Sequence, residues 1–259
     1  MMISHDLVIT TYNSYKYLNN IYFFIRDNIF LYSKIICIDD CSEINFYHKL
    51  KKKLGIFKNI IIYRNENNLG PSGSRNVGIN ISNSEYISFH DPDDYVFPKR
   101  TNYINQIILL HSPNIIFHDF TLSKIPDSFS FSNNFKKHHG YLYLFKSLYV
   151  TPAFTCKRKI LKDIGGYDSR LRYAEDFDLY IRLREKYDFF FVKDKLVKIT
   201  NRLERKLDSG HLSNNFSLMR DSINKILIKN ILKFRPESII FFFAFLLNVF
   251  KALIEKIFF

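Results

Sequence analysis

Short apolar runs alternate with longer amphipathic stretches along the N-terminal half of the chain. Continuous runs of Ile, Val and Phe are typical of strands buried on both faces, and the stretches between them are typical of helices. The pattern predicts strands at residues 7–11, 34–38, 59–63, 86–89 and 114–120, and helices at 15–27, up to 54, 72–81 and 98–111. This alternation predicts an α/β fold with a mainly parallel central sheet and helices on both faces.

The pattern loosens after Thr121. Pro126 and a stretch rich in Ser and Asn indicate a surface loop there, and regular periodicity returns at Thr151. A further helix is expected to run from Glu175 to about Lys186. We expect a catalytic domain at residues 1–212 and a helical extension at residues 213–259.

Composition narrows the choice of partners. The 259 residues include 38 Lys and Arg against 25 Asp and Glu, and the net charge of +13 favours a polyanionic partner or an acidic membrane surface. Three cysteines without metal-ligand spacing, and an N-terminus without the features of a signal peptide, indicate a cytoplasmic protein. The sequence contains no apolar run of the roughly 18 residues that a spanning helix needs.

Acidic residues follow two of the predicted strands. Asp39 and Asp40 come after the second strand, and Asp91, Asp93 and Asp94 come after the fourth. Open α/β sheets bind ligands at the carboxyl ends of their strands, although a strand end also carries Asp simply for its turn. Crowded acids repel one another unless a cation compensates them. Such oxygen ligands suit Mg²⁺ or Mn²⁺, completed by substrate phosphates and water.

Residues 68–78 form a second candidate segment, rich in glycine and serine. Its glycines allow the backbone to approach a phosphate, Ser72 is suited to cap a helix, and Arg75 is suited to pair with phosphate or carboxylate. The segment is neither a Walker loop nor a G-x-G-x-x-G motif. Taken alone, it indicates only the start of a helix.

A third candidate lies at residues 175–178, where Glu175, Asp176 and Asp178 begin a predicted helix. Acids at a helix start are stabilised by the helix dipole, and this structural role alone would explain Glu175 and Asp176. The preceding glycines at 165–166 predict a tight turn that delivers the helix to a site. Among the eight histidines, His211 is a weak candidate for a ligand.

Taken in chain order, five motifs resemble those of the family 2 glycosyltransferases, bacterial nucleotide-sugar enzymes with the GT-A fold. The motifs are Val8-Ile9-Thr10-Thr11-Tyr12-Asn13, Ile38-Asp39-Asp40-Cys41-Ser42, Gly70-Pro71 through Arg75-Asn76-Val77-Gly78, Asp91-Pro92-Asp93-Asp94, and Glu175-Asp176. Together they extend over roughly the first 185 residues. The ordered set is far more specific than any one motif.

The resemblance implies roles for individual residues. Substrate contacts are implied for Thr10, Tyr12, Asp39, Asp40, Arg75, Asn76, Asp91 and Glu175. Of these, the first two and Asp40 would contact the nucleoside, Asp39 would support that pocket, and Arg75 and Asn76 would organise the donor. A divalent cation, Mn²⁺ or Mg²⁺, is implied at Asp91, Asp93 and Asp94, with Asp93 the most direct ligand and His211 a further candidate. Asp176 is our choice of general base, which would take the proton of the acceptor hydroxyl.

The resemblance also implies inverting transfer from a nucleotide-sugar donor, which we expect to be a UDP-sugar, to a glycan or lipid-linked acceptor. Processive members usually carry a Gln/Arg-x-x-Arg-Trp motif and a bundle of membrane helices. This chain has no Trp and no spanning run, so we expect the addition of one sugar or a few. We expect an enzyme of bacterial surface polysaccharide synthesis, such as lipopolysaccharide or capsule, on the cytoplasmic face of the inner membrane.

Two other functions remain open from the sequence. A nucleotidyltransferase that makes nucleotide sugars shares the metal and nucleotide requirements, but it needs a Gly-rich loop after the first strand, where Thr11-Tyr12-Asn13-Ser14-Tyr15 stands. A basic nucleic-acid-binding protein would explain the charge of +13, but no recognisable nucleic-acid-binding motif accompanies it.

The apolar residues at 239–247 have two readings. Apolar runs of this length are commonly buried core helices. A helix that is apolar over most of its circumference and follows a basic stretch, here residues 225–235, can also lie in a membrane interface. We favour the membrane reading.

Overall fold

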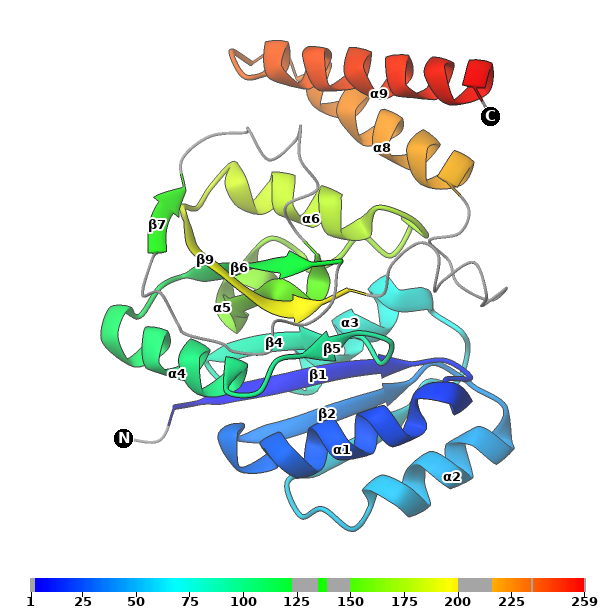
Figure 1. Cartoon of the computed structure of the whole chain (residues 1–259), viewed down its shortest axis with the longest axis vertical. Coiled ribbons are helices and arrows are strands. Elements are labelled where there is room, and N and C mark those ends of the chain that lie inside the picture. Colours follow the sequence, from blue (N-terminus) through cyan, green and yellow to red (C-terminus); the bar gives the residue numbers. More distant parts are fainter. Residues whose placement is uncertain (1–2, 123–134, 139–149, 200–215, 234, 259) are drawn as a thin grey trace.

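A single sheet organises the protein (Figure 1). The computed structural model describes residues 3–122, 135–138, 150–199, 216–233 and 235–258. Nine strands of these residues form the sheet in the order β3-β2-β1-β4-β8-β6-β9-β5, with β7 paired to β9. The strands are β1 (His5–Thr11), β2 (Lys34–Asp39), β3 (Ile60–Arg64), β4 (Tyr86–His90), β5 (Tyr95–Val96), β6 (Ile115–Thr121), β7 (Phe135–His138), β8 (Phe154–Lys157) and β9 (Phe189–Lys198).

Strands β1 to β4 are parallel to one another, as the sequence predicts. Strands β6 and β9 are also parallel, whereas β8 lies antiparallel between β4 and β6. The prediction of an α/β fold with a mainly parallel sheet is confirmed. The sequence reading assigned no strand to the residues of β8 and β9, because β8 is too short to show a period and β9 interrupts its apolar residues with lysines.

Helices cover both faces of the sheet. They are α1 (Leu18–Asn28), α2 (Ile44–Leu54), α3 (Gly70–Ile81), α4 (Arg100–His111), α5 (Arg158–Asp163), α6 (Glu175–Arg184), α8 (Phe216–Ile231) and α9 (Ser238–Phe258), with 3₁₀ turns at Tyr15–Tyr17, Ile29–Leu31 and Thr151–Ala153. Leu7 and Ile9 of β1 pack with α1 and α2, whereas Val8 packs with α3, α5 and α6. This alternation follows from the two-residue period of a strand.

Helix α3 lies unusually close to β1. A Cβ atom added to Gly78 would stand 2.4 Å from Cγ1 of Val8, so only glycine permits this approach. The N-terminus of α3 is thereby held beside the carboxyl ends of the strands. Close packing against β1 thus accounts for Gly78 in the glycine-rich segment, which resembles no phosphate loop.

The C-terminal helices α8 and α9 form an antiparallel pair that packs on α6. Ile181 of α6 is buried with Ile226 and Leu227 of α8 and with Phe241 and Ala244 of α9. Figure 1 shows the pair at the end of the molecule that lies farthest from α1 and α2. The predicted domain boundary at 212/213 falls outside the described residues, so the division remains a prediction. No helix in the described ranges is long and apolar enough to cross a membrane.

Candidate active site

Three parallel strands, β2, β1 and β4, have their carboxyl ends side by side, and these ends are called the site edge of the sheet below. Thr11 at the end of β1 pairs in register with Asp39 at the end of β2, and β4 ends at His90 on the other side of β1. The start of α3 meets this edge because the backbone of Gly70 donates a hydrogen bond to Asp40. The edge is where an open α/β sheet binds its ligands.

Asp39 is completely buried at the end of β2. Its Oδ2 accepts hydrogen bonds from Arg64 Nη1 at 2.6 Å and from the backbone N–H of Ser42 at 3.4 Å. Arg64 lies in register with Asp39 on the neighbouring strand β3, and it compensates the buried charge. The other oxygen, Oδ1, is buried and has no hydrogen-bond partner within the described ranges. Such an orphaned acceptor is rare in a folded protein.

Asp40 caps α3 from outside the helix. Its Oδ1 accepts from the backbone N–H of Leu69 and from Asn65 Nδ2, and its Oδ2 accepts from the N–H of Gly70, each at 2.8 Å. The prediction that Ser72 caps this helix is wrong, because Ser72 Oγ instead donates to the carbonyl of Leu171. A carboxylate at a helix N-terminus stabilises the unpaired N–H groups and the dipole. Asp40 thus has a structural role, and its predicted nucleoside contact stays a prediction.

Thr10 and Tyr12 lie at the end of β1. Thr10 is partly exposed between buried neighbours, and Tyr12 is 55% exposed. The loop that carries Tyr12 is fixed by Asn13, whose backbone N–H donates to Ser42 Oγ and whose Oδ1 accepts from the N–H of Glu43. Both side chains are therefore available to a ligand at this edge, and their predicted nucleoside contacts stay predictions.

Arg75 joins three segments that are far apart in the sequence. It is 5% exposed, and its Nη1 donates to Glu175 Oε1 at 2.7 Å, while its Nη2 donates to Asp91 Oδ1 at 3.0 Å. The guanidinium lies 5.3 Å from the centroid of the Tyr167 ring, a cation–π distance. Its Nε is buried and unpaired within the described ranges. One cation thus brings α3, the acidic loop after β4 and the start of α6 together.

Asn76 faces the turn before α6. Its Nδ2 donates to the carbonyl of Tyr167 at 2.8 Å, and its Oδ1 accepts from the N–H of the same residue at 2.9 Å. Gly166 has a φ of 66°, and a Cβ there would stand 2.4 Å from Asn76 Oδ1. The hydrogen bonds of Asn76 therefore position the turn before α6. Its role in organising the donor stays a prediction.

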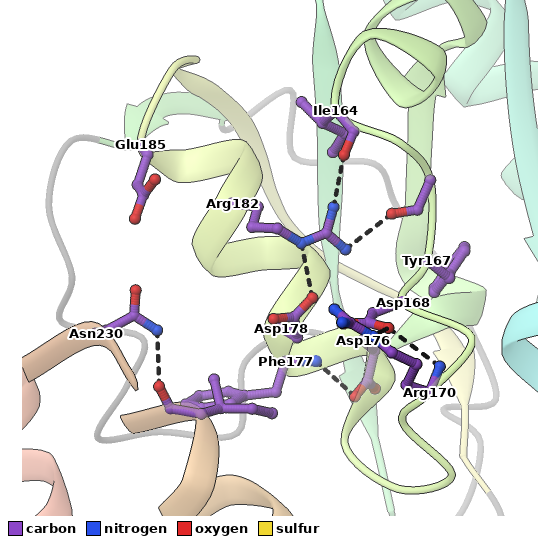
Figure 2. A network of polar contacts seen from close by, with 12 residues as sticks. Ile164, Tyr167, Asp168, Arg170, Asp176, Phe177, Asp178, Arg182, Glu185 and Asn230 are labelled. Atoms are coloured by element: carbon purple, nitrogen blue, oxygen red, sulfur yellow. Dashed lines mark hydrogen bonds and ion pairs between the residues drawn. The ribbon is translucent and has the colours of Figure 1, made fainter. Parts of the chain in front are cut away.

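Asp178 stabilises the same turn from α6 (Figure 2). Its Oδ2 accepts from Arg182 Nε at 2.7 Å, and Arg182 also donates to the carbonyls of Ile164 and Gly166. Asp178 is 3% exposed. Because its carboxylate is buried and paired, Asp178 is a poor general base.

Asp176 has a different environment in the first turn of α6. Burial and the neighbouring Glu175 carboxylate raise the pKa of Asp176 to about 7, against the lowering effect of Arg75 and of the N–H of Phe177. Part of the side chain still reaches solvent. A carboxylate with its pKa raised to about 7 suits a general base near neutral pH, and the assignment of Asp176 to that role stays a prediction.

The acidic loop after β4 begins at Asp91. Burial raises the pKa of Asp91, and the carboxylates of Asp93 and Glu175 raise it further, against the opposing effect of Arg75. Asp94 is 8% exposed, and its N–H donates to the carbonyl of Asp91 at 3.1 Å, which closes the loop into a turn. The carboxylates crowd one another, as the sequence predicts.

A metal site built from protein alone does not occur in the described part of the chain. No group of three or more His, Cys, Asp or Glu side chains there could hold a metal ion. Mg²⁺ and Mn²⁺ are, however, commonly bound by one or two carboxylates and completed by substrate phosphates and water. The carboxylates of Asp91, Asp93 and Asp94 are of the ligand type that such a cation takes, and the metal site stays a prediction. His211, the remaining predicted ligand, lies outside the described residues.

The sequence reading missed three residues that hold the site together. Arg64 pairs with Asp39, Asn65 links Asp40 to Ser74 Oγ, and the ring of Tyr167 lies beside Arg75. A signal existed for Arg64, because a cation at the end of a predicted strand next to an acidic strand end indicates a pair. Tyr167 could not be found in this way, because 92 positions separate it from Arg75 in the sequence.

The geometry and the motifs define a class of protein. Residues 6–165 match the family described as Glycosyl transferase family 2. The chain belongs to this family. The match favours a glycosyltransferase over a nucleotidyltransferase or a nucleic-acid-binding protein.

Two curated glycosyltransferases are similar to parts of this chain. An uncharacterised glycosyltransferase of Methanocaldococcus jannaschii is 31% identical over 171 residues, which cover 63% of this chain and 58% of the relative. A poly(ribitol-phosphate) beta-glucosyltransferase of Bacillus spizizenii is 39% identical over 67 residues, which cover 24% of this chain and 10% of the relative. The chain thus spans less than two thirds of the length of these curated relatives.

The fold is similar to that of S. aureus TarS residues 1–349 in complex with UDP-GlcNAc. The TM-score is 0.72 at 19% sequence identity, over 96% of this chain and 73% of the TarS chain. This likeness confirms the predicted GT-A fold.

Proposed function

We propose that this protein transfers a sugar from a nucleotide-sugar donor to a glycan or a lipid-linked acceptor. The observation that carries the proposal is the ion-pair bridge from Arg75 to Asp91 and Glu175. The bridge brings the acidic loop, suited to a donor diphosphate, next to Asp176, which has the pKa of a general base. Departure of the donor diphosphate and deprotonation of the acceptor hydroxyl would then occur in one site.

The donor end of the proposed site lies at the ends of β1 and β2. A nucleobase N–H would supply the missing partner of Asp39 Oδ1, and Tyr12 offers an exposed ring on which a base could stack. The solved relative that contains UDP-GlcNAc supports a UDP-sugar as the donor class. Asp40 would act by fixing the start of α3.

A divalent cation, Mn²⁺ or Mg²⁺, would be held by Asp93, with Asp91 and Asp94 close to it. The cation would stabilise the charge that develops on the leaving diphosphate. Arg75 holds Asp91 in place beside it. His211 remains a candidate for a further ligand.

We expect Asp93→Ala to abolish divalent-dependent donor binding, because the mutation removes the carboxylate that links metal and diphosphate. Calorimetry with UDP and Mn²⁺ measures this. Asp163→Ala, which alters an exposed acid on α5 paired with Lys159, is the matched control. Affinity in Asp93→Ala equal to that of the wild type would remove Asp93 from the metal site.

At the other end, Asp176 would accept the proton of the acceptor hydroxyl as that oxygen attacks the anomeric carbon. The family implies inversion at this carbon, and the absence of Trp from the sequence supports a non-processive enzyme. We place the enzyme in bacterial surface polysaccharide synthesis, at the cytoplasmic face of the inner membrane.

A screen of nucleotide sugars, with and without Mn²⁺, tests the function. Release of nucleoside diphosphate from one donor class is expected, with loss of release in Asp176→Asn when an acceptor is present. If no nucleotide sugar is bound or cleaved by folded protein under any of these conditions, the proposal fails.

A further inference from the structure

One face of α9 presents large apolar side chains to solvent. Its members are 45–60% exposed, and they are Ile239, Phe242, Phe243, Leu246, Leu247 and Phe250. Because an α-helix repeats every ~3.6 residues, these positions fall on one arc of roughly 140°. Phe241 and Ala244, on the opposite side, are buried against α8 and α6. The helix is thus apolar toward the protein and apolar toward solvent.

Basic residues outnumber acidic ones on the α8–α9 pair and the turn that joins the two helices. Within residues 216–251 six side chains are basic and two are acidic. Lys225, Lys229, Arg235 and Lys251 are exposed. Ile228 and Leu232 of the α8 end add exposed apolar surface beside the lysines. An exposed apolar helix face marks a docking site, and the excess of exposed basic residues on the two helices favours an anionic partner.

We propose that the α8–α9 pair docks on the surface of an anionic phospholipid bilayer. The phenylalanines and leucines of the exposed α9 face enter the boundary between headgroups and acyl chains, and the lysines meet anionic headgroups. The helix lies in the plane of the interface, since no described helix is suited to span the bilayer. This docking rests on the surface itself and not on the proposed reaction.

A second copy of the chain fits this face less well than a bilayer does. A twofold contact would pair each α9 with itself, and the run of exposed apolar residues is flanked by Arg235 before it and Lys251 after it. An antiparallel pair would place Lys251 near Arg235 of the other copy, and a parallel pair would place each beside its equivalent. Glu237 is the one acid of residues 235–251, so basic side chains are in excess at the contact in both arrangements, which disfavours self-association.

Docking would orient the catalytic helix with respect to the membrane. Ala174 and Ile181 of α6 pack against the α8–α9 pair, while Glu175 contacts Arg75 in the site. Glu185, near the end of α6, forms ion pairs with Lys233 and Arg235 in the turn between α8 and α9. The same helix therefore connects the membrane-facing surface and the proposed general base.

Vesicle co-sedimentation of the full chain, without nucleotide, tests the docking. Wild-type protein is expected to bind phosphatidylglycerol-containing vesicles more tightly than pure phosphatidylcholine vesicles. Phe242→Glu with Leu246→Glu, and separately the triple Lys225→Gln, Lys229→Gln, Lys251→Gln, should each weaken binding by roughly tenfold or more. All substituted side chains are exposed, so the fold should persist, and circular dichroism checks this.

Matched controls lie at the other end of the molecule. Phe30→Glu with Leu110→Glu changes two exposed apolar side chains, and Lys51→Gln, Lys52→Gln, Lys58→Gln removes three exposed lysines, all outside α8 and α9. The controls should bind vesicles like the wild type. Equal loss in the controls, or absence of vesicle binding by the wild type, overturns the proposal. So does a dimer in sedimentation velocity that the α9 variant disrupts. Donor cleavage measured without vesicles reports on the proposed function separately.

Discussion

Two pairs of carboxylates at this site differ in how the protein surrounds them. Asp40 at the start of α3 and Asp178 within α6 accept hydrogen bonds from well-placed donors, three for Asp40 and an arginine for Asp178. Asp91 and Asp176 instead lie among other carboxylates, and burial and these neighbours raise their pKa values. The first pair, here called saturated, has its charge met by nearby donors, whereas the second, here called crowded, lies among like charges even though Asp91 also accepts from Arg75.

The difference separates structural acids from acids available for chemistry. A saturated carboxylate stabilises the fold and has few lone pairs left for a cation. A crowded carboxylate costs stability in the free protein, and a bound cation or a proton would relieve that cost. All four acids stand in or beside motifs of similar appearance, so the sequence alone does not separate the two kinds.

The largest expected effect tests the crowded pair. Asp176→Asn preserves shape but cannot accept a proton, so transfer should fall by roughly 100-fold or more while donor affinity persists. Steady-state transfer and UDP calorimetry measure the two quantities. Wild-type transfer should also decline as the pH falls below about 7, because the base must be ionised to act.

Asp163→Asn, on the exposed surface of α5, is the control for this substitution and should transfer normally. If Asp176→Asn transfers at a near-normal rate, the base is another group. Glu175 would then be the first candidate, because Asp178 is paired with Arg182.

A smaller effect tests the saturated pair. Asp40→Ala leaves the N–H groups of Leu69 and Gly70 without their acceptor at the start of α3, which should lower the free energy of unfolding by about 2 kcal/mol. Urea denaturation measures this, with Asp27→Ala, at an exposed acid, as a control expected within roughly 0.5 kcal/mol of the wild type. Unchanged stability together with lost donor binding would make Asp40 a ligand contact instead.

Sequence patterns predicted the parts of the fold that rest on local periodicity. The strands β1 to β4 and the helices between them carry continuous apolar runs or helical spacing, so their type and order follow from the sequence. Strands β8 and β9 follow from long-range pairing with β4 and β6, which no local pattern reports. Position in the sheet, and not local preference, makes these residues strands.

The site was predictable by residue type and not by contact. The family resemblance assigned Arg75, Asp91, Glu175 and Asp176 to one site, and the structure places Arg75 between Asp91 and Glu175. The sequence did not indicate that Asp40 caps α3 from the adjacent strand, because the carboxylate and the helix start are 29 to 30 positions apart. Ser72 has the local signature of a cap and nevertheless donates elsewhere.

The last comparison sets stability against activity at one residue. The pKa of Asp176 is raised from its ordinary value of 3.8 to about 7 in the folded protein, so folding favours the protonated acid. The associated stability is present below the unfolded pKa and is lost as the pH rises through the folded pKa. Asp176→Asn, which is neutral throughout, should therefore be more stable than the wild type near pH 8. The gain should shrink as the pH is lowered toward about 5. Urea denaturation of both proteins across this range measures the gap. A gap that is constant or grows on acidification would show that Asp176 is not crowded in the folded state, and would place it with the saturated acids.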